Sequence, residues 1–253
     1  MNNNATSLSY KNILSRPLSV RMTLRDVIYI SYALPVKILQ PLVPSALRLA
    51  TVGSDIAFIS LVVLRCTRVR LSAFPLVNLN YNQLNIRTYV TDPISGRPAV
   101  YFIESGVTSR LVSFATSSIG IPWQLVELMT ELTISEEVRY LSIWGDWDGR
   151  FSFKVQSDIN VAIAPLYFEN EISAVDFLIR PLIGFAGDDR RLVGFTIQHP
   201  EVQPENWSLT ELDFPLLKKL MTIDDFKDTH SVFYLPTADF SIFLPPTRIK
   251  KKG

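Results

Sequence analysis

The sequence predicts a single α+β domain built around an antiparallel sheet or barrel. Short stretches of alternating or β-branched residues recur along most of the chain, and only a few segments have helical spacing. No repeat, linker or low-complexity run divides the sequence. A length of 253 residues is ordinary for one barrel or sandwich, and it allows a sizeable core without disulfides or metals.

The composition argues against several classes of protein. The net charge of +1 offers nothing that attracts a polyanion, so we expect no nucleic-acid partner. Cys66 is the only cysteine, so no internal disulfide can form. The polar segment Met1 to Ser9 lacks the apolar region of a signal peptide, and the longest apolar stretch, Ile56 to Leu64, is too short to span a bilayer. We therefore expect a cytoplasmic protein without a transmembrane segment.

The chain is expected to have one domain with loose ends. Residues 1–20 are predicted to be a leader, residues 21–247 the domain, and residues 248–253 a solvated basic tail. Hydrophobic residues make up 47% of the chain and charged residues only 19%. The apolar excess must fill a large core, line a cavity or cover an interface, so a homo-oligomer stays among the expected partners.

The N-terminal part is predicted to be extended, with one short helix. Val27 to Tyr32 has the composition of a strand, and Pro35 suits the first turn of a helix over Val36 to Leu39. Asp55 to Leu71 has the pattern of a long strand. Its first half is apolar apart from Ser60, so we expect both of its faces to be covered.

The middle of the chain alternates between predicted strands and helical pieces. Strands over Leu84–Val90 and Ala99–Ser105 flank the turn formers of residues 92–96, which predicts a hairpin. Ser109 to Ser118 has apolar residues at helical spacing. A second helical piece is expected from Pro122 through Leu132.

The C-terminal part returns to strands. Asp148-Gly149 is a tight-turn dipeptide between predicted strands over Tyr140–Trp147 and Phe151–Gln156. The other expected elements are a capped helix from Ser173 through Ile179, a strand over Leu192–Gln198, a helix over Leu209–Met221 interrupted near Pro215, and strands over Ser231–Leu235 and Ala238–Leu244.

One face of the predicted hairpin is the leading candidate for chemistry. Side chains alternate along a strand, so Asn85, Arg87 and Tyr89 share a face. A symmetric closure of the loop puts Phe102 and Glu104 on that face too, and a register slip of one would change this. Inside a barrel, Arg87 would offer a planar fork to a carboxylate or carbonyl, and Glu104 would neutralise it or carry a proton. The alternative is a surface ion pair on a solvated sheet.

Other candidate chemistry has weaker support. A Schiff base needs a lysine with a depressed pKa in an apolar pocket, and the settings of Lys37 and Lys154 are those of exposed lysines. His199 and His230 are not at metal-ligand spacing, so we expect neither a metal nor a cofactor. The chain has no phosphate-binding glycine loop and no Gly-x-Ser-x-Gly elbow.

Two stretches carry a resemblance to a known family. Residues 41–47, PLVPSAL, are similar to an N-terminal "P..LP..L" segment. Residues 81–90, YNQLNIRTYV, with GRPAVYF at 96–102, resemble the "E-L-N-V-R-T-Y-V … G-V-Y-F" core of the YqjF-like family, which belongs to the acetoacetate decarboxylase-like superfamily. The specific part is the string from Asn85 to Val90, and the resemblance extends over most of the chain.

The resemblance implies a curved antiparallel β-barrel with a few peripheral helices, which encloses a pocket. It places the polar face of the hairpin in that pocket. On this basis Arg87 clamps an anion or carbonyl, Asn85 and Tyr89 orient the ligand, and Trp123 forms a wall. The expected site consists of Arg87 and Glu104 as catalytic residues and of the ligand-binding residues Gln83, Asn85, Tyr89, Phe102 and Trp123.

The sequence departs from the decarboxylases at two places. Acetoacetate decarboxylases carry a glutamate where Gln83 lies here. Their Schiff-base lysine belongs to a Pro-Lys-Lys string, and the matching residues 122–124, PWQ, contain no lysine. The resemblance therefore argues against decarboxylation of acetoacetate through a Schiff base.

Three functions are open at this point. The first is binding of a small, largely apolar molecule that carries a carbonyl or carboxylate. The second is a lysine-independent lyase, cyclase or isomerase on an oxo compound, in which Arg87 polarises the carbonyl and Glu104 moves the proton. The third is a scaffold or interaction protein, with a filled barrel and an exposed apolar patch.

Overall fold

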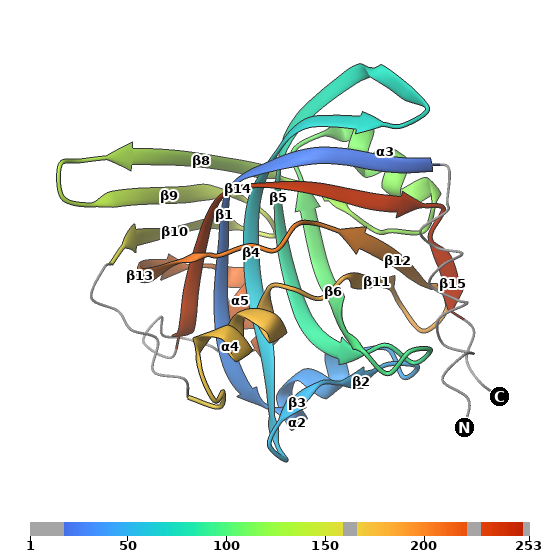
Figure 1. Cartoon of the computed structure of the whole chain (residues 1–253), viewed down its shortest axis with the longest axis horizontal. Helices are drawn as coiled ribbons and strands as arrows, with labels where there is room; N and C mark the ends of the chain where they lie inside the picture. The colour runs from blue at the N-terminus through green and yellow to red at the C-terminus, as the bar shows by residue number, and fades with distance from the viewer. Residues whose placement is uncertain (1–17, 159–165, 222–228, 250–253) are drawn as a thin grey trace.

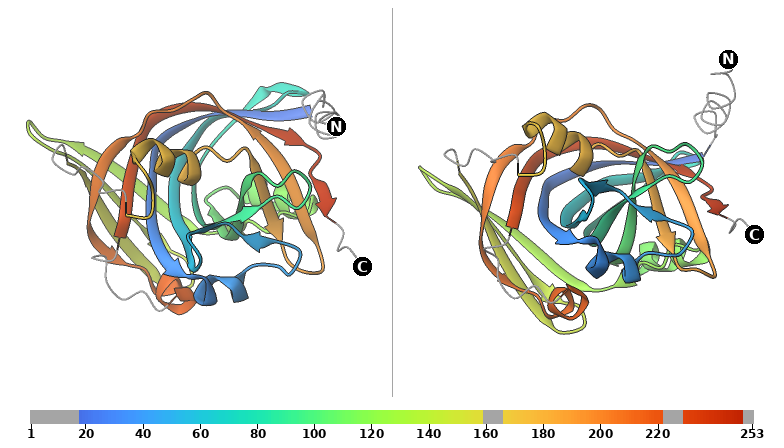
Figure 2. Two further views of the ribbon diagram at one scale, coloured as in Figure 1. Left: turned by 60° about the horizontal axis from the view of Figure 1, so that its bottom comes forward. Right: turned by 90° about the horizontal axis from the view of Figure 1, so that it is seen from below.

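A computed structural model describes residues 18–158, 166–221 and 229–249 of the chain. In these ranges one large sheet dominates the molecule (Figure 1). Part of the sheet curls into a ring, and the rest leaves the ring as a second arm that folds back against it (Figures 1 and 2).

The ring is closed by hydrogen bonds between strands. Its described strands, in spatial order, are β12 (Leu192–Gln198), β11 (Ile183–Gly187), β6 (Pro98–Val107), β5 (Phe74–Thr91), β4 (Ile56–Leu71), β1 (Leu18–Pro35) and β14 (Thr229–Leu244). The pairs Ile197–Ile242 and Gln198–Ser241 join β12 back to β14 and close the circle. The pairing is antiparallel except between β6 and β11, which run parallel and thus depart from the expected antiparallel order.

The arm continues the sheet from β14. It comprises β13 (Glu205–Asp213), β10 (Arg150–Ser157), β9 (Arg139–Asp146) and β8 (Glu127–Ile134). The short strands are β2 (Arg48–Leu49), β3 (Thr51–Val52), β7 (Gln124–Leu125) and β15 (Thr247–Ile249). The helices are α2 (Val36–Leu39), the 3-10 turn η1 (Gln40–Leu42), α3 (Arg110–Ser118), α4 (Glu171–Leu178) and α5 (Pro215–Met221). Helix α4 lies at one end of the ring (Figure 2).

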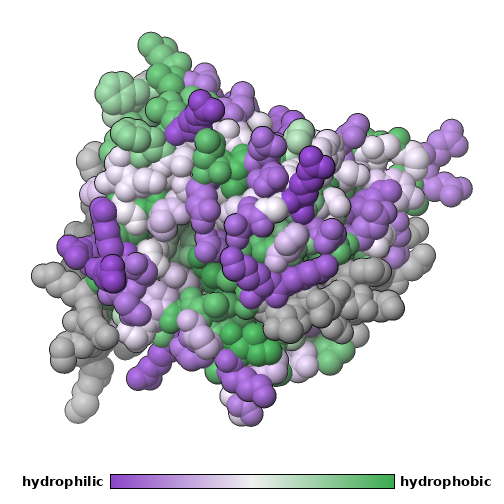
Figure 3. Space-filling model, turned by 180° about the vertical axis from the view of Figure 1, so that it is seen from behind, coloured by the Kyte–Doolittle hydropathy of each residue, from purple (hydrophilic) through white to green (hydrophobic). Residues whose placement is uncertain are grey.

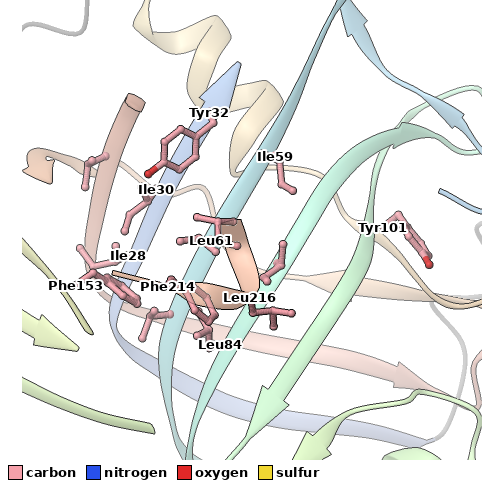
Figure 4. Packing of buried hydrophobic residues seen from close by; sticks show 14 of the residues in the cluster. Ile28, Ile30, Tyr32, Ile59, Leu61, Leu84, Tyr101, Phe153, Phe214 and Leu216 are labelled. Atoms are coloured by element: carbon pink, nitrogen blue, oxygen red, sulfur yellow. The ribbon is translucent and has the colours of Figure 1, made fainter. Parts of the chain in front are cut away.

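The long strand β4 separates two hydrophobic cores, as its apolar first half predicted. Phe58, Val62 and Leu64 point into the ring and join the inner core. Ile59 and Leu61 point outward, where β1, β4 and β5 pack against the arm and α5 (Figure 4). Each such side chain stabilises the fold by about 1.5–3 kcal/mol when it is buried fully. The two cores together fix which face of each ring strand points inward.

Most predicted strands are confirmed, including both hairpins. The turn between β9 and β10 has positive φ at Asp148 (57°) and Gly149 (123°), as a tight turn of this kind needs. The strands predicted over Ser231–Leu235 and Ala238–Leu244 form one continuous strand, β14. The predicted capping box of α4 is different in detail, because the cap is Asn170, whose side chain accepts from the Ser173 amide.

Two helix predictions were wrong. Residues 122–132 do not form a helix: β7 and β8 lie there, and β8 pairs with β9 along its whole length. Residues 209–213 belong to β13, and the helix begins only at Pro215, where the missing amide of proline costs no hydrogen bond. In both segments sheet pairing with a distant strand overrides local helical spacing.

Paired strands continue beyond residues 21–247 at both ends of the described chain. Residues 18–20 belong to β1 rather than to a loose leader, and Leu18 pairs with Leu244. Arg248 and Ile249 belong to β15, which pairs with β12. The remainder of the predicted leader and tail lies outside the described residues. Within the described ranges, no helix combines the length and the apolar character needed to cross a membrane.

Candidate functional site

The ring encloses a cavity of about 60 Å³ on its inner side. Side chains of the ring strands make most of the wall apolar. The polar and aromatic side chains in the wall are those of Tyr29, Gln83, Asn85, Arg87, Phe102, Trp123, Phe195, His199 and Phe240. Ligand sites usually measure roughly 300–1,000 Å³, so this cavity fits only a very small molecule unless side chains move.

Five of the predicted site residues line this one cavity. They are Gln83, Asn85, Arg87, Phe102 and Trp123. The period-2 alternation of β5 brings the first three to the inner face, while Leu84 and Ile86 point to the outer core. The structure thus brings together residues that the sequence placed on one face, and it places that face inside the ring.

Arg87 is a buried cation with few partners. Only 9% of the residue is exposed. Its Nη2 donates to the Leu178 carbonyl at 2.6 Å, while its buried Nε has no hydrogen-bond partner in the part of the chain that the structure describes. The guanidinium carbon lies 5.1 Å from the ring centre of Tyr29 and 5.6 Å from that of Tyr89. None of the carboxylates in the described ranges forms an ion pair with it. Buried charges are normally paired, so this fork is available to an anion or a carbonyl.

The partner of Arg87 is the end of a helix. Leu178 is the last residue of α4, and its carbonyl also accepts from the Tyr89 hydroxyl at 2.9 Å. Helix C-termini present unsatisfied carbonyls and a partial negative charge, which stabilises a nearby cation. The Tyr89 hydroxyl bonds Ser60 Oγ as well, at 2.7 Å. Tyr89 therefore holds α4 against the ring and supports Arg87 from behind the cavity wall.

Tyr29 covers the other side of the guanidinium. Burial raises the pKa of its phenol above the ordinary value, and Arg87 opposes that rise only in part. The phenol is therefore uncharged at neutral pH. In the described wall, the uncharged Tyr29 ring therefore packs against the charge of Arg87 without neutralising it.

Gln83 and Asn85 form an amide pair beside Arg87. Gln83 Nε2 donates to Asn85 Oδ1 at 2.8 Å, and both residues are almost fully buried. Cys66 Sγ lies 4.0 Å from Gln83 Oε1. Burial raises the pKa of the Cys66 thiol to about 12, so it is a protonated, unreactive thiol. The pair contributes polarity to the wall without adding charge.

The prediction for the position of Glu104 was wrong. The β5–β6 pairing runs Arg87–Phe102 and then Ile86–Glu104, so Ile103 is an extra residue in a β-bulge. Paired residues share a face of the sheet. Glu104 therefore lies on the outer face with Ile86, and only Phe102 shares the face of Arg87.

Glu104 belongs to a separate network outside the ring. Its Oε2 accepts from Gln124 Nε2 at 2.7 Å, and Gln124 Oε1 accepts from the Trp147 indole at 3.2 Å. Burial raises the pKa of the Glu104 carboxyl above its ordinary value. Glu104 does not reach the cavity that Arg87 lines.

Sequence reasoning missed three polar groups of this site: the side chains of Tyr29 and His199, which line the cavity, and the Leu178 carbonyl, which binds Arg87. Tyr29 could have been found, because it alternates with Ile28 and Ile30 in a predicted strand and so faces the other way. His199 lines the wall and stacks on Phe240 with 5.7 Å between ring centres. The Leu178 carbonyl is a backbone group far along the chain, and no side-chain pattern signals it.

Lysines and metal ligands take no part in the described cavity. No lysine occurs among the described residues of its wall. Over residues 18–158, 166–221 and 229–249, no three His, Cys, Asp or Glu side chains are arranged to hold a metal ion.

Comparison with solved structures defines the class of this fold. An acetoacetate decarboxylase-like enzyme from Sphingomonas wittichii matches with a TM-score of 0.58 and 11% identity, over 95% of this chain and 96% of that chain. Acetoacetate decarboxylase from Legionella pneumophila matches with a TM-score of 0.58 and 14% identity, over 91% and 87%. The enduracididine biosynthesis enzyme MppR, complexed with pyruvate, matches with a TM-score of 0.55 and 10% identity, over 93% and 91%. The fold is therefore acetoacetate decarboxylase-like.

The sequence itself defines the family. The model of the DUF2071 family, described as an uncharacterized conserved protein, matches residues 21–239. The chain belongs to this family, the YqjF-like family that the Asn85 to Val90 string predicted. No curated protein matches the sequence significantly.

Proposed function

We propose that this protein binds a small molecule with a carboxylate or carbonyl group inside the ring, with Arg87 as the clamp. The observation that carries the proposal is the buried guanidinium in the cavity wall, whose Nε has no partner. A planar fork with a free N–H recognises a carboxylate or carbonyl oxygen by direct hydrogen bonds. An oxygen of such a ligand supplies the hydrogen-bond acceptor that Arg87 Nε lacks among the described residues.

The surroundings of Arg87 select the rest of the ligand. Met22, Leu24, Val62 and Phe195 give the wall its apolar character, so the body of the ligand is apolar and short. Short 2-oxo acids combine both properties. The solved complex of MppR with pyruvate, a protein of the same fold, supports the choice of pyruvate as a first probe.

The remaining predicted residues have subordinate roles in this proposal. Asn85 and Gln83 supply polar contacts, and Phe102 and Trp123 form walls. Tyr89 positions Arg87 through the shared Leu178 carbonyl. Covalent capture as a Schiff base requires an amine nucleophile, and no lysine occurs among the described residues of the cavity wall. The proposed binding is therefore noncovalent.

Binding is favoured over the lysine-independent enzyme. That alternative assigns the proton transfer to Glu104 at the ligand held by Arg87. Glu104 lies on the opposite face of the hairpin, and its carboxylate bonds Gln124 outside the ring. A general acid or base has to come within hydrogen-bond reach of the proton that it moves.

The first experiment is native mass spectrometry of the freshly purified protein, compared with the denatured chain. Isothermal titration calorimetry with pyruvate and 2-oxobutyrate follows, on the wild type, on Arg87→Met and on the matched control Arg25→Met, which replaces an exposed arginine of β1. We expect Arg87→Met to weaken binding of the acid by about tenfold to a hundredfold and the control to bind normally. A protein that carries no native ligand and binds neither acid, or that binds equally after Arg87→Met, would overturn the proposal.

We also propose self-association through the end of the β4–β5 hairpin. Phe74, Leu76 and Val77 are 65%, 94% and 53% exposed there. Apolar side chains gather at this projecting corner (Figure 3). Exposed apolar patches of this kind mark contact surfaces between proteins. Light scattering coupled to size exclusion should give a multimer for the wild type and a monomer for Leu76→Ser, and a monomeric wild type would exclude self-association.

A further inference from the structure

A second pocket lies on the outer side of Phe102 and Trp123. It has a volume of about 540 Å³, within the usual range for small-molecule sites. Phe102 and Trp123 line both this outer pocket and the inner cavity, so they form the partition between the two. The outer pocket is bounded by β6, by the segment after α3 and by the turn between β11 and β12. The Tyr101 hydroxyl donates to the Gly187 carbonyl at 2.8 Å and fixes this turn against β6.

Two buried polar atoms in residues that line this pocket have no partner in the described part of the chain. They are the indole Nε1 of Trp123 and the hydroxyl of Ser105, in residues that are 8% and 3% exposed. An indole nitrogen can only donate, and a serine hydroxyl can donate. Buried polar groups are normally satisfied, and leaving one unpaired is destabilising. Ser105 pairs with Asn85 and so shares its inner face, whereas the Trp123 indole, in a residue that lines the outer pocket, calls for an acceptor oxygen from a bound molecule.

Charges of opposite sign face this pocket. The Arg191 side chain forms no ion pair with any carboxylate of the described ranges. Its guanidinium lies directly on the backbone of Gly120, where a Cβ would come within 2.4 Å of the Arg191 Nε. Gly120 also has φ of +89°, a backbone conformation that favours glycine. Both the close contact and the backbone therefore require a glycine here. Glu104 supplies the negative charge, and its Oε2 is oriented by Gln124.

The nearby Asp188 does not neutralise Arg191 through its side chain. Its Oδ1 accepts from the backbone amides of Arg190 and Arg191, both at 2.9 Å, so it serves to shape the turn. Besides Asp188, the charged groups in this wall are the guanidinium of Arg191 and the carboxylate of Glu104.

We propose that the outer pocket is a binding site for a small zwitterion of the amino acid type. The carboxylate of the ligand accepts from Arg191 and from the Trp123 indole. Its ammonium group donates to Glu104. This site is separate from the Arg87 cavity, and the inference does not rest on the function proposed for that cavity.

The test begins with saturation-transfer NMR on the wild-type protein and the twenty common L-amino acids, each at 1 mM as an order-of-magnitude choice for weak ligands. Calorimetry then measures the affinity of the strongest binder and of its two analogues, one without the amino group and one without the carboxyl group. We expect both analogues to bind about tenfold or more weakly, since each lacks one charge-assisted contact. The absence of any amino acid that binds, or analogues that bind as tightly as the amino acid itself, would overturn the proposal.

Matched variants identify the site. Arg191→Met and Glu104→Gln should each weaken amino acid binding about tenfold or more, while the exposed neighbours Arg190→Met and Glu127→Gln should leave it unchanged. Arg191 is exposed, so its replacement is expected to fold normally. Equal affinity in Arg191→Met and Arg190→Met would place the amino acid elsewhere.

Two further variants separate this site from the inner cavity. Trp123→Phe keeps an aromatic ring in the partition and removes only the N–H donor, so circular dichroism should be unchanged while amino acid binding falls. Arg87→Met should leave amino acid binding intact. A loss of amino acid binding in Arg87→Met, with wild-type circular dichroism, would show that the inner cavity is where the amino acid binds.

Discussion

Replacing Arg87 by methionine should weaken ligand binding without lowering the free energy of unfolding. Methionine has a similar length, is apolar and adapts to irregular cores. In most proteins the loss of a buried arginine strands its carboxylate partner and costs several kcal/mol. Here the hydrogen-bond partner among the described residues is the Leu178 carbonyl, and that carbonyl keeps its bond from Tyr89.

The magnitude follows from the contacts of the guanidinium. The substitution loses one charge-assisted hydrogen bond, about 1.5–3 kcal/mol, and two cation–π contacts, about 0.5–2 kcal/mol each. It also removes the penalty for burying the charge, which amounts to several kcal/mol. The loss of these contacts and the removal of the burial penalty nearly cancel in the free energy of unfolding. We expect the free energy of unfolding to stay unchanged or to rise by up to about 3 kcal/mol, while acid binding weakens by about tenfold to a hundredfold.

Urea denaturation followed by circular dichroism measures this effect directly. Arg25→Met is the control, and its exposed side chain should change the unfolding free energy by no more than about 0.5 kcal/mol. A fall of more than about 2 kcal/mol in Arg87→Met would refute the reasoning, since it would make Arg87 a structural residue.

Three other predictions concern the surroundings of the two pockets. Tyr89→Phe removes a hydroxyl that donates to the Leu178 carbonyl, so urea denaturation should show a fall of about 1–2 kcal/mol in the free energy of unfolding. An unchanged free energy of unfolding would contradict this role of the hydroxyl. Gly187→Ala should lower the melting temperature strongly, because φ is +102° and a Cβ would meet the Arg191 carbonyl oxygen at 1.9 Å; an unchanged melting temperature would contradict this. Burial raises the pKa of Glu104, so the carboxyl destabilises the fold once it ionises. The stability of Glu104→Gln relative to wild type should therefore rise as the pH increases from about the ordinary pKa of glutamate through the higher pKa of the folded state. A difference that stays flat as the pH rises from that ordinary value would contradict this prediction.

The side chains that share one face of β5 could be predicted because this depends on local alternation, whereas only the family resemblance placed that face in a pocket. Once the strand over Leu84–Val90 was recognised, Asn85 and Arg87 had to share a face, and the apolar Leu84 and Ile86 had to point toward a core. The same reasoning predicted that β4 is covered on both faces. Neither conclusion required knowledge of distant contacts.

The rest of the site depends on contacts that local patterns do not encode. The bulge at Ile103 adds one residue to β6, and because the side-chain period of a strand is 2, it reverses the face of Glu104. The Leu178 carbonyl reaches Arg87 from 91 residues further along the chain. Residues 127–134 form a strand only because β9 lies beside them.

The bulge also has a functional consequence, since it assigns Arg87 and Glu104 to different pockets. Phe102 and Trp123 stand between the pockets, and the two charged side chains share no hydrogen-bond partner among the described residues. Substitutions at independent sites are additive within about 0.3–0.5 kcal/mol. In the double variant Arg87→Met/Glu104→Gln, the losses of acid binding and of amino acid binding should equal those of the single variants. A coupling energy above about 1 kcal/mol in that cycle would mean that one ligand extends through the partition and contacts both residues.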